Sequence, residues 1–120
     1  MKLTINRKRW YRGYRFGSRL IREEDNKQCC LGFYGRALKI PAKKMVNVGG
    51  PSGVDPKYRS RWGKLLNEKG QATKLCLDFY AANDAVGNGS IPREDYSETK
   101  REKDITRLFK KLGVTVVFTN

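Results

Sequence analysis

The stretch from Gln28 to Ile40 constrains the fold most, because it is the least charged run in a very basic chain. Its apolar residues recur at the spacing of one helical face: Cys30, Phe33, Tyr34, Ala37 and Leu38. Pro41 predicts that this helix ends near residues 39–40. Gly32 and Gly35 each cost a helix about 1 kcal/mol relative to alanine. We therefore expect another element to pack closely over them and this helix to form the centre of the core.

The same stretch carries a sequence motif. Lys27–Phe33 reads Lys-Gln-Cys-Cys-Leu-Gly-Phe and resembles the CCLGF motif of a family of small uncharacterised proteins encoded by bacteriophages and prophages. Further pieces match that family in order along nearly the whole chain: Thr4-Ile5-Asn6, Ser18-Arg19-Leu20-Ile21, Asn83-Asp84 and Gly113-Val114-Thr115-Val116-Val117-Phe118. The resemblance implies a phage origin and no particular chemistry.

Composition limits the class of protein. A chain of 120 residues is expected to form one domain, residues 1–120. It has no apolar run near 18 residues and no apolar signal-peptide region at its start, so we expect a cytoplasmic protein, in the host cell if a phage encodes it. Three cysteines without a signal peptide predict reduced, buried thiols. With no histidine, neither a Cys-His or Ser-His nucleophile nor a His-ligated metal site is possible, and no metal or cofactor is predicted.

The net charge of +14 is distributed unevenly. Residues 1–60 contain 15 Lys and Arg against 4 Asp and Glu, or +11, whereas residues 61–120 contain 11 against 8, or +3. A one-sided positive field predicts a polyanionic partner, either nucleic acid or an acidic protein surface.

Periodicity and turn residues predict the remaining elements. Strands are expected at residues 3–5, 18–23 and 114–119. Helices are expected at residues 58–68 and 96–112, the latter capped by Ser97 or by a Thr99–Glu102 capping box. Residues 73–83 fit either a strand or a helix, and their alanine content favours a helix. The predicted fold is a small α+β domain in which helices cover one face of an antiparallel sheet.

The first candidate functional segment, residues 7–22, interleaves arginines with aromatic residues. Seven of its sixteen residues are basic: Arg7, Lys8, Arg9, Arg12, Arg15, Arg19 and Arg22. Between them lie Trp10, Tyr11, Tyr14 and Phe16. Arginine binds phosphate in a bidentate manner, and aromatic rings stack on unpaired bases. The alternative is that the aromatic residues belong to the core and the arginines form a solvated face.

The second candidate surrounds the Gly- and Pro-rich loop at residues 46–56. Its basic residues are Lys39, Lys43, Lys44, Lys57, Arg59, Arg61 and Lys64. Backbone amides of the loop glycines could hold a phosphate, although the spacing is not that of a P-loop. A mobile basic loop that wraps a polyanion and a plain surface loop are the alternatives.

Two further sets are weaker. The carboxylates Asp78, Asp84, Glu94 and Asp95 could hold Mg²⁺ or act in acid–base chemistry, but turn and helix-cap roles explain them better. The Cys29-Cys30 pair lacks a base or a resolving thiol, so it is interpreted as core.

These features favour a non-enzymatic phage accessory protein, active in host takeover or against host defence. Its expected partner is DNA, RNA or a host nucleoprotein complex, bound by the basic N-terminal surface. The alternative is an inhibitor or sponge for an acidic host protein or a small phosphorylated ligand, and a small metal-dependent nuclease is the least favoured. The residues predicted to bind nucleic acid or another anion are Arg7, Lys8, Arg9, Trp10, Arg12, Tyr14, Arg15, Arg19, Lys43, Lys44, Lys57, Arg59 and Arg61.

Overall fold

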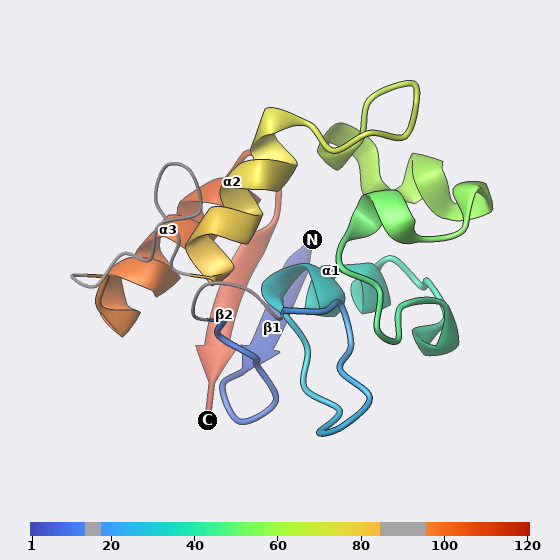
Figure 1. The fold of residues 1–120 in the computed structure, drawn as a ribbon. Coiled ribbons are helices and arrows are strands. Elements are labelled where there is room, and N and C mark those ends of the chain that lie inside the picture. The colour runs from blue at the N-terminus through green and yellow to red at the C-terminus, as the bar shows by residue number, and fades with distance from the viewer. Residues whose placement is uncertain (14–17, 85–95) are drawn as a thin grey trace.

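A computed structural model describes residues 1–13, 18–84 and 96–120 (Figure 1). In chain order, these residues form strand β1 (Lys2–Asn6), helix α1 (Cys30–Ala37), the 3-10 helices η1 (Ala42–Lys44), η2 (Pro51–Gly53) and η3 (Pro56–Leu65), helices α2 (Lys74–Asn83) and α3 (Glu98–Lys110), and strand β2 (Thr115–Thr119).

The two strands pair in parallel, so the prediction of an antiparallel sheet was wrong. Lys2 lies opposite Thr115 and Asn6 lies opposite Thr119. The tight turn between α3 and β2 explains this direction. After α3 the chain turns tightly at Gly113 (φ 74°), and the Thr115 N–H donates to the Met1 carbonyl, so β2 starts beside the start of β1. The whole intervening chain acts as the crossover that parallel strands require.

Residues 18–23 do not form the predicted strand. Their backbone hydrogen bonds go to several segments instead of one neighbour: the Leu20 N–H donates to the Val48 carbonyl, and the Arg19 carbonyl accepts from the Cys29 N–H. Ile21 makes only an isolated bridge to Val46. Because these partners lie on both sides, no continuous ladder forms, and the segment instead joins α1 to the loop at residues 45–48.

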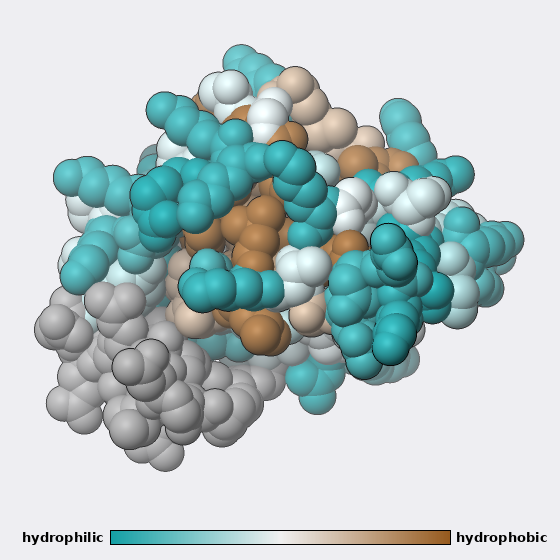
Figure 2. All heavy atoms as spheres, turned by 90° about the horizontal axis from the view of Figure 1, so that it is seen from above, coloured by the Kyte–Doolittle hydropathy of each residue, from teal (hydrophilic) through white to brown (hydrophobic). Residues whose placement is uncertain are grey.

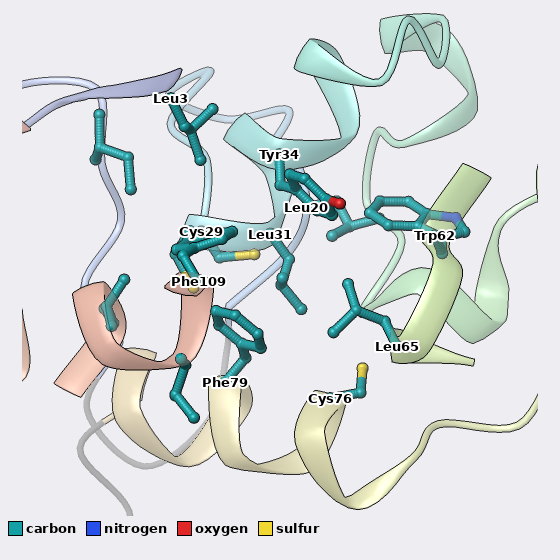
Figure 3. Close-up of a cluster of buried hydrophobic side chains, with 14 of the residues drawn as sticks. Leu3, Leu20, Cys29, Leu31, Tyr34, Trp62, Leu65, Cys76, Phe79 and Phe109 are labelled. Carbon is teal, nitrogen blue, oxygen red and sulfur yellow. The ribbon is translucent and has the colours of Figure 1, made fainter. Parts of the chain in front are cut away.

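Helix α1 lies in the core, as expected (Figure 3). Its buried face differs from the predicted one: Cys30 and Tyr34 are buried, together with Leu31 and the two glycines, whereas Phe33, Ala37 and Leu38 are only half-buried. Its two glycines are the points of closest approach. A Cβ on Gly32 would overlap the Leu20 carbonyl oxygen, and a Cβ on Gly35 would lie 2.5 Å from the Met45 sulfur and 2.7 Å from the Trp62 ring. The helix ends at Ala37, two residues before the predicted end, because Lys39 turns left-handed (φ 67°) ahead of the proline.

The other helices follow local signals with two corrections. The predicted helix at residues 58–68 is a 3-10 helix interrupted at Gly63 (φ 56°). In α3, Ser97 accepts from the Lys100 N–H at 3.2 Å, so the cap is Ser97 and not the Thr99 capping box. The prediction of a helix at residues 73–83 is confirmed, with Thr73 as its N-cap. Helices α1 and α3 pack on the inner face of the sheet, where Leu3, Ile5 and Val116 are buried.

Candidate nucleic-acid interface

Of the aromatic residues in the first segment that we expected to stack on bases, Trp10 lies in the core. Trp10 is 2% exposed, its ring packs on Phe118 at 5.3 Å between centroids, and its indole N–H donates to Asn83 Oδ1 at 2.8 Å. Its ring is therefore not available to a ligand. Tyr14, Arg15 and Phe16 lie outside the described residues.

Most of the described arginines in the same segment bind groups within the molecule. Arg7 makes two hydrogen bonds of 2.8 Å to Glu102, which raise the pKa of its guanidinium. Arg12 pairs with Glu98 at 3.1 Å and lies over the Trp10 ring. Arg22 pairs with Glu24 at 2.9 Å and stacks on Tyr11.

The other described residues of this segment that we predicted to bind nucleic acid are Lys8, Arg9 and Arg19. Arg19 is half-buried and donates to the Ser18 carbonyl at 3.1 Å. Lys8 and Arg9 are exposed and have no carboxylate partner among the described residues. The N-terminal surface therefore offers much less free positive charge than the sequence count implies.

The second predicted group forms a more open positive surface, here called the basic cluster: Lys39, Lys43, Lys44, Lys57, Arg59, Arg61 and Lys64. Residues 38–65 contain these seven cations and one carboxylate, Asp55. The 3-10 helices η1–η3 lie on the right in Figure 1, and Figure 2 shows mostly hydrophilic residues on that side of the molecule. An apolar area lies near the centre of the view.

Specific contacts bring the basic cluster together. Arg61 Nη1 donates to the Lys39 carbonyl at 2.9 Å, at the end of α1. The Lys57 ammonium and the Arg61 guanidinium each lie 5.1 Å from the centroid of the buried Tyr58 ring. Lys44 reaches Asp55 at 3.6 Å. Residues from η1, η3 and the turn after α1 thus share one surface.

Asp55 organises this surface without neutralising it. It caps η3 by accepting from the Lys57 N–H at 3.1 Å while its other oxygen faces Lys44. The Lys57 N–H, followed by the Lys44 and Lys57 charges, lowers the pKa of Asp55, so the carboxylate stays ionised and joins η1 to η3. Six of the seven cations have no carboxylate partner in the described part of the chain.

A shallow hollow of about 440 Å³ lies at one side of the basic cluster. Lys57, Arg59 and Ser60 line it together with Gly63 and Asn67, and the carboxylate of Glu68 also lies at its wall. The two cations and the hydroxyl group are suitable donors to a phosphate, whereas Glu68 would repel one.

The Gly- and Pro-rich loop at residues 46–56 is a packed connector. Gly50 and Pro51 are buried, and Gly50 lies so close to Tyr80 of α2 that a Cβ there would overlap the phenol oxygen. Residues 51–53 form η2. The loop therefore holds η1 and η3 in place.

A buried polar network, which sequence reasoning did not identify, ties segment 7–13 to the helices. Asn83 is 2% exposed, and Arg101, at 4%, donates to the carbonyls of Gly13 (3.2 Å) and Asn83 (2.7 Å). Burial lowers the pKa of the Arg101 guanidinium, and the Glu98 charge opposes this effect. Both residues occupy apolar positions of their helices, four residues from Phe79 and Ile105 respectively, and this is the signal that could have revealed them.

The other predicted sets have structural roles. Asp78 pairs with Lys74 at 3.3 Å, whereas Glu94 and Asp95 lie outside the described residues. All three cysteines are buried free thiols, and burial raises the pKa of Cys29 to about 12. Among residues 1–13, 18–84 and 96–120, no three Cys, Asp or Glu side chains gather closely enough to hold a metal ion.

Asp84 should make stability depend on pH. Burial raises its pKa above the ordinary value of 3.8, opposed by hydrogen bonds from Ser18 and Asn83 and by the Arg101 charge. A carboxyl with a raised folded-state pKa stabilises the fold below pH 3.8, and this contribution is lost as pH rises through the folded-state pKa. We expect urea titrations to show the free energy of unfolding of the wild type falling relative to Asp84→Asn as pH rises from about 4. Parallel pH profiles of the two proteins would contradict this.

Within the described ranges, no helix has the length and apolar character needed to span a membrane. No family model matches the chain, and no curated protein and no solved structure matches it.

Proposed function

We propose that this protein binds nucleic acid through the basic cluster, and that it contacts the phosphate backbone. The observation that carries this proposal is a surface formed by η1, η3 and the turn after α1, a stretch (residues 38–65) that contains seven cations and one carboxylate, Asp55. Phosphate contacts supply most of the affinity of sequence-independent nucleic-acid binding.

The described side chains favour contacts to phosphates over stacking on bases. Every aromatic residue in the described ranges is buried or half-buried, and Tyr58 lies beneath Lys57 and Arg61. Lysines provide mobile point charges, and the guanidinium groups of Arg59 and Arg61 can bind phosphate oxygens in a bidentate manner. The proposal requires no catalytic step, and DNA, RNA or a nucleoprotein complex would each offer the same phosphates.

A salt titration tests the proposal. Fluorescence anisotropy with labelled single- and double-stranded DNA and RNA should show affinity falling steeply with salt. Neutralising about four phosphates of a duplex predicts a slope of about −3.6 in log K against log salt. The variant Lys43→Glu with Lys57→Glu should bind at least about tenfold more weakly and show a slope shallower by about 1.8.

The matched control is Lys8→Glu with Arg9→Glu, which changes the net charge equally on the N-terminal surface. We expect it to retain most of the affinity. Equal losses in both variants would indicate attraction by net charge alone. A loss of affinity only in the Lys8 and Arg9 variant would place the binding site on the N-terminal segment. A shallow salt slope, together with tight binding of a small phosphorylated ligand, would show that the partner is such a ligand and not nucleic acid.

The proposed location is the cytoplasm, where a reducing environment suits three cysteines present as free thiols. The phage origin and the accessory role rest on the sequence motif at residues 27–33 and stay predictions.

A further inference from the structure

A groove runs along α3, next to Phe118 near the end of β2. It has a volume of about 580 Å³, and its walls are the outer side of α3 from Glu98 to Lys110 together with Arg7 and Phe118. Figure 1 shows β2 lying between β1 and α3. The groove therefore lies between α3 and the end of β2, the strand whose other edge pairs with β1, and on different elements from the basic cluster.

The free edge of β2 presents backbone groups without partners. The Thr115 N–H donates to the Met1 carbonyl and the Thr119 carbonyl accepts from the Arg7 N–H, so alternate residues, including Val117, bond to β1. In a parallel pair the residues between them, Val116 and Phe118, direct their N–H and C=O groups to the other side. Neither residue makes a backbone hydrogen bond to any other segment in the described part of the chain.

The walls of the groove are positively charged once internal ion pairs are counted. Arg7 and Glu102 neutralise each other, and Glu98 is paired with Arg12. Lys103 and Lys110 are exposed and have no carboxylate partner among the described residues. Arg107 contacts Asp104 only at 3.8 Å and is 60% exposed at its side chain.

We propose that this groove binds an extended acidic segment of a partner protein, which adds as a strand to the free edge of β2. Backbone hydrogen bonds to Phe118 and Val116 would hold the segment, and its carboxylates would face Lys103, Arg107 and Lys110. Charge complementarity selects this occupant over a second copy, because a second copy would bring the same cations to the edge of a chain with net charge +14. The proposal does not depend on the nucleic-acid function.

Amide hydrogen exchange measured by NMR tests the proposal directly. The probe is a capped ten-residue peptide of alternating glutamate and valine. In the free protein the N–H groups of Val116 and Phe118 should exchange fast, whereas those of Val117 and Thr119 should be protected. Saturating peptide should slow exchange at Val116 and Phe118 by at least about tenfold and leave Val117 and Thr119 unchanged.

Two controls separate backbone pairing from charge attraction. A peptide with proline in place of each valine keeps the charge but cannot donate to the edge, and it should not protect Val116 or Phe118. The variant Lys103→Glu with Lys110→Glu should bind the valine peptide at least about tenfold more weakly. Lys43→Glu with Lys57→Glu has the same change in charge and should bind it normally, with an unchanged spectrum in all variants confirming the fold.

Other occupants would be visible in the same spectra. Protection of Val116 and Phe118 that rises with protein concentration, without peptide, would assign the edge to a second copy. Protection by an oligonucleotide would assign the groove to nucleic acid. Equal affinity for the valine and proline peptides would show that charge attraction alone, without backbone pairing, explains the binding. Each of these results would overturn the proposal.

Discussion

Replacing Asn83 with leucine should lower the free energy of unfolding by more than about 3 kcal/mol, the largest effect expected in this molecule. Its Oδ1 accepts from the Trp10 indole N–H at 2.8 Å and from the Cys30 N–H at 3.0 Å. Its Nδ2 donates to the Tyr11 carbonyl and Ser18 Oγ, each at 3.1 Å. Leucine would leave these groups without partners, and a buried unpaired polar group costs about 1–3 kcal/mol.

Urea unfolding followed by far-ultraviolet circular dichroism measures this loss, because the helical signal does not depend on the fluorescence of Trp10, which contacts Asn83. Trp10→Phe removes one donor and keeps a buried ring. In a double-mutant cycle, Asn83→Leu should therefore cost less in the Trp10→Phe background than in the wild type. A loss below about 1 kcal/mol for Asn83→Leu would show that the network does not stabilise the fold.

Replacing Gly32 with alanine should destabilise the protein by about 2–4 kcal/mol, although helix propensity predicts the opposite sign. Helix propensity alone predicts a gain of about 1 kcal/mol for this change. The added Cβ would overlap the carbonyl oxygen of Leu20, a backbone atom that cannot rotate away. Leu20 and α1 would have to separate in the centre of the core, which is close-packed.

Two other glycines provide matched controls for thermal or urea unfolding. A Cβ on Gly35 would meet side chains, the Met45 sulfur and the Trp62 ring, and the flexible methionine can move, so Gly35→Ala should cost less than Gly32→Ala. Gly49 has no neighbouring atom within 4 Å of an added Cβ, so Gly49→Ala should change stability by less than about 0.5 kcal/mol. Equal effects at Gly32 and Gly49 would refute the close approach.

The candidate site could be predicted in part. The charge count of residues 38–65 marks the basic cluster in the sequence. Its assembly depends on Arg61, which reaches the carbonyl of Lys39 across 22 residues. For the N-terminal arginines the charge count was misleading, because Arg7 and Arg12 are paired with carboxylates. Their partners, Glu102 and Glu98, lie 95 and 86 residues away in the sequence. A charge count does not reveal which cations are paired at such separations.

Local interactions determined most elements of this fold, and the sequence alone predicts α1, α2, α3, β1 and β2, although it wrongly predicts a strand at residues 18–23. The apolar spacing of α1, the Ser97 cap and the Gly113 stop of α3, and the alternation of β1 and β2 each act within a few residues. The tertiary structure alone decided the parallel direction of the strands, the burial of Trp10 and the Asn83 network. These depend on contacts between segments far apart in the sequence, such as Trp10 and Asn83 (73 residues), and no local pattern encodes which distant partners will meet.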